Sequence, residues 1–498
     1  DNNINENIIN SYPGYGITLW YCSRYNIKGN IMTESGIWIS STMIEHWNTH
    51  NIDTLNTVNG KPVYYWKNQV GGTVPLGSGE IILANCSKVT IENQKLTNGS
   101  VGILLGFSSY NFINGNNVSS QRIGIYLLRS NENLIVNNTS FFNSQDGIGI
   151  GTSDGNMVVD NIASDNDFGV SIYVSTKNNV FKNNISNNNF DGMFLYNSDE
   201  NNIRYNDFYS NERYGVWPRQ SDANNITANN FYQNNEYGVY LLDSSYNYIY
   251  HNNMIENIDQ AYDNRDNNYF DNGYPSGGNY WSDYFGMDLY HGVNQNIPGS
   301  DGIGDFPYTI DSDTQDNYPL FKPYRFYVNY VILKEGWNLI STQLIIEDQN
   351  PMKVLNMIHG HYDAVQWYDP TNIIDPWKHY KTRKPNGNDL SHLNETMGFW
   401  IHITQPGGMI LLYNGTEFTI NKTVTLHPGW NMVGYPSLTS YNRTVGLNNL
   451  TFGQQVDIIQ WYDASTQTWY DMDENDYFVP GRGYWIHANI ECEWEVPL

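Results

Sequence analysis

Short apolar stretches recur along the first half of the chain at a nearly constant interval. A glycine marks each copy, and the positions one and three residues after it are aliphatic in nearly every copy, as in Ile103 and Leu105. Alternation with a period of two over so few residues predicts a short strand with one buried face. The marker glycines lie 22 or 23 residues apart, at Gly102, Gly124, Gly147, Gly169, Gly192, Gly215 and Gly238.

Asparagine recurs at three fixed distances after the marker glycines. It follows all seven glycines at nine and at fourteen residues, and six of them at nineteen, with Gln121 as the exception. Asn suits turns because it tolerates left-handed backbone angles and bonds to nearby backbone. Identical side chains stacked about 4.8 Å apart can also bond to one another. The first column holds Asn111, Asn133, Asn156, Asn178, Asn201, Asn224 and Asn247.

Three short strands and three turns in each 22–23-residue repeat predict one coil of a parallel β-helix. Gly16 and Gly36 look like markers of earlier coils, and Glu80 stands in the marker position of another. Between them, "NTVNGKPVYYWKNQVGGTVPLG" (56–77) breaks the pattern, so we expect a protruding loop there. The sequence begins in the middle of a coil, so either upstream coils were removed or another subunit or segment covers that edge.

The repeat decays after Asn257, and two Trp-rich segments follow that match each other. "EGWNLIS" (335–341) matches "PGWNMVG" (428–434), "VQWYDP" (365–370) matches "IQWYDA" (459–464), and "GFWIHI" (398–403) matches "GYWIHA" (483–488). We therefore predict an all-β chain with four parts: a β-helix over 1–275, an acidic cap over 276–325, and two small tandem β modules over 326–422 and 423–498.

The coils and the closing segment 278–324, with its "GNYWSDY", "DGIGD" and "DNYPL" motifs, resemble the NosD-like, PbH1-repeat group of secreted proteins. That resemblance implies a right-handed β-helix and a surface location of the kind common among archaeal proteins. The wider group includes carbohydrate-binding and sugar-hydrolase domains and has no single activity. Its name is linked to copper delivery, but this chain lacks the Met, His and Cys cluster that copper favours, so we do not expect that role.

Composition limits the partners. With 51 acidic and 25 basic residues the formal charge is −26, which argues against nucleic acid and anionic membranes. No apolar run is long enough to span a bilayer, and three cysteines are too few for a disulfide framework. Several Asn-X-Ser/Thr sequons favour an extracellular glycoprotein. The candidate glycosylation sites are Asn117, Asn184, Asn225, Asn394, Asn414, Asn421, Asn442 and Asn449.

Carboxylates gather in the Gly-rich loops of the predicted cap. Hard cations take six to eight oxygen ligands from such loops, so calcium is the one candidate cofactor. The alternative is an acidic loop that only hydrates the end of the solenoid, since no EF-hand spacing is present. The candidate ligands are Asp301, Asp305, Asp311, Asp313 and Asp316.

Aromatic residues occupy outward positions two and four residues after the markers. Such a stripe can stack on sugar rings or contact a protein partner, unless another part of the chain covers it. The stripe consists of Tyr126, Tyr173, Phe194, Tyr196, Trp217 and Tyr240.

Three smaller groups are open to a chemical or a structural interpretation. Asp146 and Asp191 each precede a marker glycine two coils apart, which approaches the carboxylate spacing of inverting hydrolases, although Phe168 intervenes. The "HGHYD" segment (359–363) could bind a transition metal or form an exposed loop. His402 and His487 hold equivalent places in the two modules, which favours a shared structural role.

The sequence favours a non-enzymatic extracellular structural or adhesive surface protein. It would associate with itself, as a filament or envelope layer, or with other cell-surface proteins. The alternative is a carbohydrate-binding or polysaccharide-cleaving β-helix that uses its lateral face. Contiguous subunits would favour assembly, and an uncovered cleft with two carboxylates and a base would favour catalysis.

Overall fold

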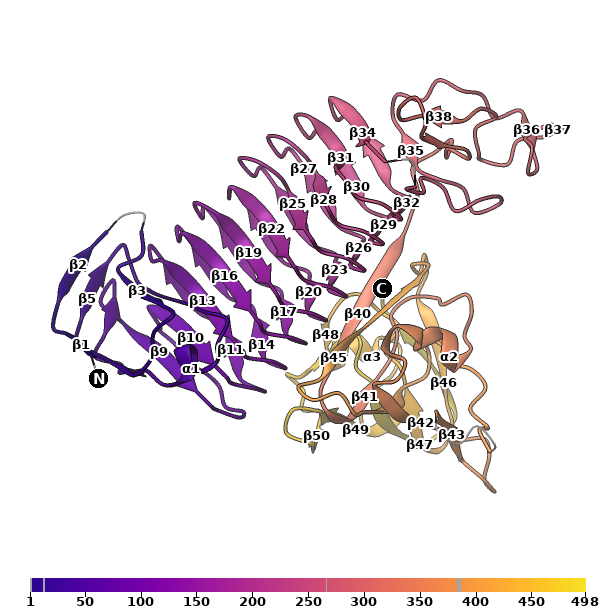
Figure 1. The fold of residues 1–498 in the computed structure, drawn as a ribbon. Helices are drawn as coiled ribbons and strands as arrows, with labels where there is room; N and C mark the ends of the chain where they lie inside the picture. Colours follow the sequence, from indigo (N-terminus) through magenta and orange to yellow (C-terminus); the bar gives the residue numbers. More distant parts are fainter. Residues whose placement is uncertain (1, 12–13, 266, 383–386) are drawn as a thin grey trace. The chain divides into compact units, whose positions relative to one another are not determined.

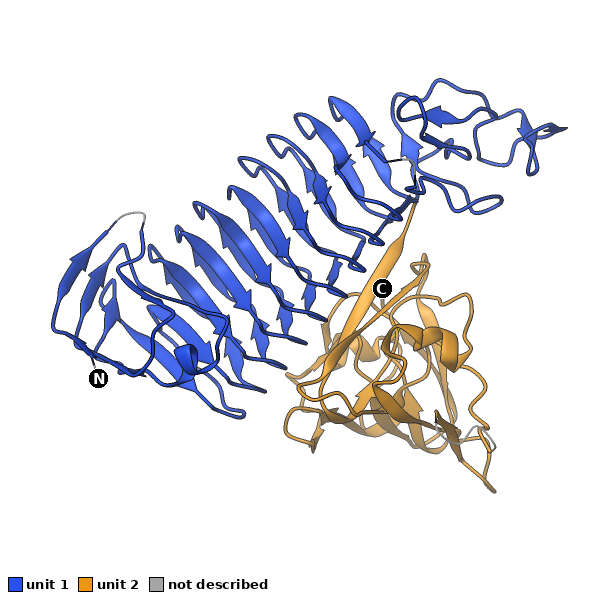
Figure 2. Cartoon of the chain, in the orientation of Figure 1, with its two compact units in different colours: residues 1–324 blue, residues 325–498 orange. Residues whose placement is uncertain are grey.

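The computed structural model describes residues 2–11, 14–265, 267–382 and 387–498. The chain divides into two compact units, residues 1–324 and 325–498 (Figure 2). The first unit holds the solenoid and its closing segment, and the second holds both Trp-rich modules. Among the described residues, no helix has the length and hydropathy that crossing a membrane would require.

The first unit is a right-handed parallel β-helix of about 12 turns. Its coils follow one another from the N-terminal strands to the hairpin β36–β37 at the opposite end of the unit (Figure 1). Three sheets of 13, 8 and 9 strands run along it. The 13-stranded sheet contains β2 (Ile8–Asn10), β5 (Ile31–Thr33), β8 (Thr57–Val58), β9 (Lys61–Lys67), β10 (Glu80–Ala84), β13 (Val101–Gly106), β16 (Ile123–Leu128), β19 (Asp146–Gly151), β22 (Phe168–Tyr173), β25 (Met193–Tyr196), β28 (Val216–Arg219), β31 (Tyr237–Leu241) and β34 (Asp259–Asp263).

The two narrower sheets complete each coil. The 8-stranded sheet contains β11 (Thr90–Glu92), β14 (Phe112–Asn114), β17 (Leu134–Val136), β20 (Met157–Val159), β23 (Asn179–Phe181), β26 (Asn202–Arg204), β29 (Asn225–Thr227) and β32 (Tyr248–Tyr250). The 9-stranded sheet contains β12 (Lys95–Thr97), β15 (Asn117–Ser119), β18 (Thr139–Phe141), β21 (Ile162–Ser164), β24 (Asn184–Ser186), β27 (Asp207–Tyr209), β30 (Asn230–Tyr232), β33 (Asn253–Ile255) and β35 (Tyr280–Trp281).

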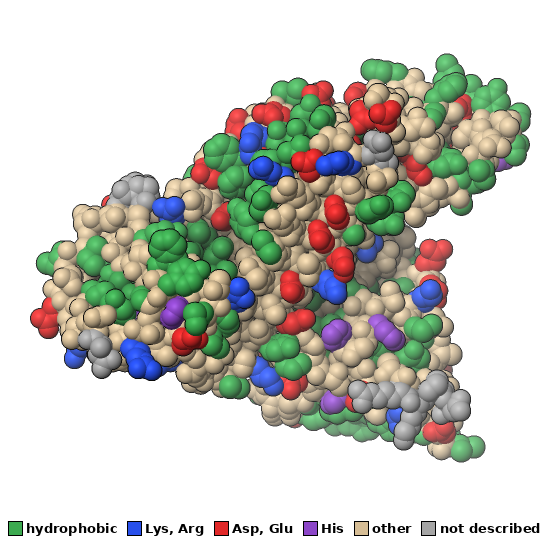
Figure 3. All heavy atoms as spheres, in the orientation of Figure 1, with side chains coloured by type: hydrophobic (Ala, Val, Ile, Leu, Met, Phe, Trp, Pro, Cys, Tyr) green, Lys and Arg blue, Asp and Glu red, His purple; other side chains and the backbone are tan. Residues whose placement is uncertain are grey.

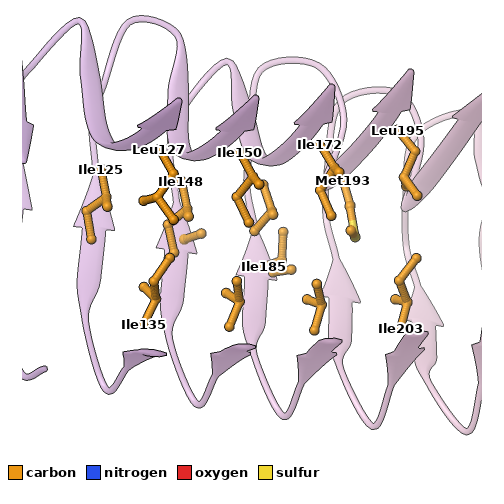
Figure 4. Close-up of a cluster of buried hydrophobic side chains, with 14 of the residues drawn as sticks. Ile125, Leu127, Ile135, Ile148, Ile150, Ile172, Ile185, Met193, Leu195 and Ile203 are labelled. Carbon is orange, nitrogen blue, oxygen red and sulfur yellow. The ribbon is translucent and has the colours of Figure 1, made fainter. Parts of the chain in front are cut away.

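The predicted aliphatic positions form the core of the solenoid. Side chains such as Ile125, Leu127, Ile148 and Ile150 are fully buried and pack inside the coils (Figure 4). Strand register places each above its counterpart, as Ile125 pairs with Ile148. Each coil therefore buries its aliphatic residues against the coils on either side, and repetition extends a single core.

The asparagine columns are stacked as the spacing predicts. Asn111 Nδ2 donates to Asn133 Oδ1 at 2.9 Å, and Asn133 Nδ2 donates to Asn156 Oδ1 at 3.1 Å. The backbone N–H of Asn133 also donates to Asn156 Oδ1, at 2.9 Å. The columns that begin at Asn116 and Asn143 repeat this arrangement. These buried amides satisfy one another from coil to coil, which removes the cost of burying them.

The expectation that the ladder asparagines themselves adopt left-handed backbone angles is wrong. The left-handed residue is the one just before each ladder position, as in Tyr110 (φ 63°), Glu132 (φ 56°) and Asn137 (φ 55°). Even Val174 (φ 49°) takes this conformation. The ladder Asn is therefore selected for side-chain bonding, while the stacked neighbours fix the turn for whatever residue precedes it.

The N-terminal coils also differ from the prediction. The strands that follow Gly16 and Gly36, β3 (Ile17–Trp20) and β6 (Ile37–Ser40), form a separate two-stranded sheet instead of joining the 13-stranded one. Beside them lie β1 (Asn2–Asn5), β4 (Tyr25–Lys28), β7 (Asn51–Ile52) and the short α1 (Glu45–Asn48). These N-terminal elements share a core cluster with Ile82 and Leu104, which makes the outward side of β10 and β13 buried.

The expected protruding loop over 56–77 is wrong in its central part. Residues Lys61–Lys67 form β9, which runs antiparallel to β8 and parallel to β10. Asn59 and Gly60, with φ angles of 50° and 76°, make the two-residue turn between β8 and β9. Asn-Gly between strands is a strong hairpin signal, and it reverses the chain here.

The closing segment ends the solenoid with β35 and two small hairpins. The hairpins are β36 (Tyr290–His291) with β37 (Ile297–Pro298), and β38 (Tyr308–Thr309) with β39 (Gln315–Asp316). Trp281 of β35 is 1% exposed and lies over the last coil of the core. This segment therefore belongs to the first compact unit.

Each Trp-rich module has a four-stranded and a two-stranded antiparallel sheet, the second module has a further two-stranded sheet, and both modules lie in one compact unit. The first module contains β40 (Tyr327–Leu333), β41 (Gly336–Ile340), α2 (Pro351–Val354), the 3-10 helix η1 (Asn356–Ile358), β42 (Tyr362–Tyr368), β43 (Trp377–Lys381), β44 (Phe399–Ile403) and β45 (Met409–Gly415). The second contains β46 (Lys422–Leu426), β47 (Gly429–Val433), β48 (Tyr441–Asn442), α3 (Arg443–Leu447), β49 (Val456–Asp463), β50 (Thr468–Asp471), β51 (Tyr477–Phe478), β52 (Tyr484–Ala488) and β53 (Cys492–Val496).

Candidate binding face of the solenoid

The outward side of the 13-stranded sheet carries a continuous array of half-buried aromatic rings over β25, β28, β31 and β34. Register places Phe194 beside Trp217, and Tyr240 beside Tyr262. The ring centroids of these pairs lie 4.7 Å and 4.6 Å apart, and 6.4 Å separates Trp217 from Tyr240. Rings in the same outward position of successive coils thus form one row.

A second row lies beside the first. Tyr214 stacks on Tyr240 with a centroid distance of 4.5 Å and an interplanar angle of 4°, and Tyr237 packs against Tyr240 at 5.2 Å. On the other flank, Tyr173 and Tyr196 lie 5.6 Å and 6.3 Å from Phe194. The rings hold one another in place, so this face is rigid and presents ring edges and phenol hydroxyls.

Five of the six predicted aromatic residues share this array, and Tyr126 does not. Gly149 and Ser171 occupy the equivalent positions between Tyr126 and Phe194, so the row is interrupted. Tyr126 instead packs 5.5 Å from Trp38 of the N-terminal coils, and burial raises its pKa. We refer below to the set without Tyr126 as the aromatic face: Tyr173, Phe194, Tyr196, Tyr214, Trp217, Tyr237, Tyr240 and Tyr262.

Two arginines lie within the aromatic face. The guanidinium carbon of Arg213 lies 5.2 Å from the ring of Tyr214 and 5.1 Å from that of Trp217. Arg219 lies 5.7 Å from Tyr196 and 5.9 Å from Trp217. These distances are those of cation–π contacts, so the face combines positive charge with apolar surface.

Asp191 supports Arg213 from beneath. Its fully buried side chain accepts a hydrogen bond from Arg213 Nη2 at 2.8 Å. Burial raises the pKa of Asp191 to about 6, and the charge of Arg213 acts in the opposite direction. The carboxylate therefore positions the arginine.

Asp146 is a separate site. Its buried carboxylate accepts a short hydrogen bond from Ser171 Oγ, and burial raises its pKa to about 6. Phe168 is its register partner on the next coil, and Asp191 follows one coil later. Each carboxylate is therefore hydrogen-bonded to its own partner, Asp146 to Ser171 and Asp191 to Arg213.

Most carboxylates of the closing segment bind loop backbone. Asp305 accepts from the N–H groups of Leu289 and Tyr290, and Asp311 accepts from those of Asp313 and Thr314 at 2.8 Å. Asp301 accepts from Ile303 N–H at 3.1 Å. The described part of the chain contains no group of three or more His, Cys, Asp or Glu side chains that could hold a metal ion. The five predicted ligands therefore do not converge on a calcium site.

Asp316 has a different role. Its Oδ2 accepts from Asn279 N–H at 2.7 Å and from Trp281 Nε1 at 2.9 Å, and its Oδ1 accepts from Tyr318 N–H at 3.0 Å. Asn279 is the last member of the column that begins at Asn116. Burial raises the pKa of Asp316 to about 7. This carboxylate therefore ends an asparagine column.

The "HGHYD" residues form separate contacts. His361 Nδ1 bonds Gln405 Oε1 at 2.8 Å, whereas Asp363 Oδ1 bonds His402 Nδ1 at 2.8 Å. His487 makes the equivalent bond to Asp457, at 2.7 Å. The segment does not form a metal site, and the two equivalent histidines share one arrangement.

The eight candidate sequons differ in access to the amide nitrogen that a glycan would modify. Asn225 and Asn449 already donate that nitrogen, to Asn202 Oδ1 at 3.2 Å and to Glu493 O at 2.7 Å. Asn414 and Asn421 are exposed, so they are the stronger candidates. The remaining half-buried sites are Asn117, Asn184, Asn394 and Asn442.

Two features escaped the sequence analysis although the repeat contained their signal. Serine stands six residues after each marker glycine, and these serines form a fourth ladder in which Ser108 N–H donates to Ser130 Oγ at 3.0 Å. Cys86 lies in the same column, with its N–H donating to Ser108 Oγ. The second was the position before the marker, which supplies Tyr214 and Tyr237 to the aromatic face.

Two family models match the solenoid. The model described as "Periplasmic copper-binding protein (NosD)" matches residues 139–286, and the model "Right handed beta helix region" matches residues 66–204. No curated protein is significantly similar to the chain.

Several solved structures share the fold at low identity. A point mutant of the periplasmic alginate epimerase AlgG is 15% identical and has a TM-score of 0.36, covering 57% of this chain and 68% of its own. The A-module of the Azotobacter vinelandii mannuronan C-5 epimerase AlgE6 is 12% identical with a TM-score of 0.32, covering 54% and 88%. Tailspike protein 2 of bacteriophage CBA120 is 8% identical with a TM-score of 0.30, covering 86% and 77%.

The copper named in the first family description does not fit the donors of this chain. Copper sites combine soft sulfur and imidazole ligands, but Cys86 is buried with its sulfur donating to Trp66 O, and the described residues contain no group of three or more His, Cys, Asp or Glu side chains that could hold a metal. The kinship is therefore one of architecture. Residues 139–286 match the NosD model and residues 66–204 match the right-handed β-helix model, so the solenoid is similar to the NosD-like group of right-handed β-helix proteins that the sequence motifs indicated.

Proposed function

We propose that this protein is a non-enzymatic adhesive scaffold that binds a polysaccharide chain along the aromatic face of its solenoid. The aromatic face is the observation that carries this proposal. Its rings span five successive coils and are half-buried and rigid, and two arginines lie among them. Rigid Tyr and Trp side chains offer large contact area with little loss of conformational entropy on binding.

The repeat of the solenoid favours an extended ligand. Successive coils present an aromatic side chain at each strand spacing, about 4.8 Å apart. A polymer lying along the axis would therefore meet equivalent groups at regular intervals. Such an array gains affinity by many similar contacts.

We place the protein in the periplasm or outside the cell. The matching family model describes a periplasmic protein. The charge of −26 also favours a surface that resists nonspecific association. Figure 3 shows acidic side chains scattered over a surface formed mainly by uncharged polar groups and backbone.

The arrangement of the buried carboxylates favours binding over cleavage. Asp146 is engaged by Ser171 and Asp191 by Arg213, and the two lie on different coils. A hydrolase of the usual kind needs two carboxyl groups that face the same bond. Incubation with the bound polymer should therefore release no reducing ends, and their release would establish the enzymatic alternative.

Affinity electrophoresis through gels that contain soluble polysaccharides tests the proposal. The wild-type chain should be retarded by at least one polymer, and Trp217→Ala should lose most of that retardation because Trp217 contacts both rows and both arginines. Tyr232→Ala is the matched control, since Tyr232 stacks on Tyr209 at 5.2 Å on the 9-stranded sheet. Equal retardation of Trp217→Ala and wild type would refute binding at this face.

Sedimentation of the same variants tests the competing role of the face. If the aromatic face joins copies of the chain, wild type should form concentration-dependent oligomers that Trp217→Ala does not form. That result, without retardation by any polysaccharide, would assign the face to self-assembly.

A further inference from the structure

The two Trp-rich modules repeat one architecture within their compact unit. The four-stranded sheets have the orders β41-β44-β42-β43 and β47-β52-β49-β50, in which corresponding strands occupy corresponding places. Each sheet also has a register shift at the same point, between Tyr362 and Ala364 and between Val456 and Ile458. Structurally equivalent residues can therefore be compared directly.

The modules contact each other reciprocally. Trp400 of the first module packs against Tyr462 and Trp469 of the second, at 4.8 Å and 5.5 Å. Trp485, its equivalent, packs against Tyr368 and Trp377 of the first, at 5.0 Å and 6.1 Å. This exchange resembles the contact across a twofold axis in a homodimer. It explains why Trp400 and Trp485 are present.

A second pair of tryptophans flanks that contact: Trp337 lies 6.0 Å from Trp400, and Trp430 lies 5.8 Å from Trp485. Trp337 packs on His402 at 4.9 Å within the first module, and Trp430 packs on His487 at 5.2 Å within the second. Strand register places each tryptophan directly opposite its histidine. All four side chains are half-exposed.

Each histidine is held in a defined state by a carboxylate. The carboxylates of Asp363 and Asp457 can only accept, so the bonds at 2.8 Å and 2.7 Å place the proton on Nδ1 of His402 and His487. The Nε2 atom of a neutral imidazole then keeps its lone pair. Each set therefore combines an aromatic ring, an acceptor nitrogen and a partly exposed carboxylate.

We propose that these two sets, Trp337–His402–Asp363 and Trp430–His487–Asp457, are equivalent binding sites for a neutral pyranose ring. The tryptophan contacts the apolar C–H face of the sugar, and Nε2 and the carboxylate accept hydrogen bonds from its hydroxyls. Neutral sugars fit because the two sets supply acceptors and no cation, and because the chain carries −26 overall.

The sites are separate from the aromatic face of the solenoid and deepen its proposed role. Two equivalent sites in one compact unit would bind two sugar rings per chain. Linked sites raise the affinity for a polymer because the second binding event becomes intramolecular.

Titration calorimetry of the full-length Trp217→Ala chain tests this inference, because that background removes the solenoid face. The probes are cellohexaose, maltohexaose and chitohexaose at neutral pH. We expect at least one probe to bind with two sites per chain, Trp337→Ala to leave one site of unchanged affinity, and the double variant Trp337→Ala/Trp430→Ala to leave none. Asp363→Asn should weaken one site about tenfold.

Tyr470→Ala is the control, since Tyr470 is exposed and stacks only on Trp461 of its own module at 4.8 Å. It should leave both sites intact. No binding of any probe, or two sites remaining in the double variant, would overturn the inference. Because polysaccharide retention by the aromatic face is measured with Trp217 present, either proposal can fail alone. Melting curves of each variant show whether a lost site reflects lost folding.

Discussion

Each ladder asparagine bonds to the coils on both sides of it. Asn156 Oδ1 accepts from the N–H and Nδ2 of Asn133, and its own Nδ2 donates to Asn178 Oδ1 at 3.1 Å. A side chain of the same size without polar atoms would leave Asn133 N–H unpaired on one neighbouring coil and remove one of the two donors to Asn178 Oδ1 on the other. One residue thus affects three coils.

Replacing Asn156 tests this coupling. Asn156→Leu should lower the free energy of unfolding by about 2–3 kcal/mol, because Asn133 N–H loses its acceptor in a buried site and Asn178 Oδ1 keeps only the backbone N–H of residue 156. Urea denaturation followed by circular dichroism measures the shift in midpoint. Asn189→Ala, which removes an exposed amide bonded to Asp167, should cost less than ~0.5 kcal/mol. Similar costs for both variants would contradict the ladder argument.

The sequence predicted the regular coils because their period is long, strict and shared by side chains with different roles. It did not predict Arg213 as part of the aromatic face, since a single arginine carries no period. The reversal at Asn59-Gly60 shows a different limit: a local turn signal outweighed the marker glycines, and β9 took the place expected for an earlier coil. The reciprocal packing of Trp400 and Trp485 depends on two modules meeting in space, which their matching sequences do not specify.

At the scale of the element, the asparagine columns need an end as well as a repeat. The column from Asn111 ends where Asn268 Nδ2 donates to Asp263, and the column from Asn143 ends where Asn257 Nδ2 donates to Gln260. Asp316 ends the third. The last strand of the 13-stranded sheet, β34, therefore supplies two of these acceptors and the closing segment supplies the third, where the next coil would have supplied them.

We expect the titration of Asp316 to make the stability of the protein depend on pH. Its pKa rises from 3.8 to about 7 on folding because the side chain is buried. Folding therefore favours the neutral form of Asp316. Its contribution to the free energy of unfolding is complete below about pH 4 and is lost as pH rises through about 7. The full effect is on the order of 4 kcal/mol.

Asp316→Asn should therefore change the slope of stability against pH. At about pH 4 the variant should be less stable than wild type, because it loses one acceptor for buried N–H groups. By about pH 8 the difference should shrink or reverse, because wild type must then bury a charge. Denaturant unfolding across this range measures both. The exposed Asp313→Asn should run parallel to wild type, and a parallel Asp316→Asn curve would contradict the assignment.

At the scale of the whole molecule, charge opposes compactness. A formal charge of −26 is spread over 498 residues with few cations to offset it. Like charges on a folded surface repel one another more than in an expanded chain, and salt screens this repulsion.

Sodium chloride should accordingly stabilise the protein. Raising its concentration from about 0.01 M to about 1 M shortens the screening length from ~30 Å to ~3 Å and should raise the melting temperature at pH 7 by several degrees. Calorimetry or fluorescence melting measures the change. Near the isoelectric point of about 4.6 the same addition should have little effect. An equal rise at both pH values would show that salt acts through something other than net charge.

The asparagine columns also give the solenoid a direction. In all three, the amide N–H groups point toward higher residue numbers and the amide oxygens point back. Because the amide dipoles are aligned, each column has a donor end and an acceptor end. The columns of two solenoids can therefore bond end to end only when both run in the same direction. Solenoids meeting head to head would set oxygen against oxygen, and tail to tail would set hydrogen against hydrogen. Asp263, Gln260 and Asp316 already accept from the last donors of the three columns. The C-terminal end of the columns is therefore closed to bonding with the columns of another solenoid.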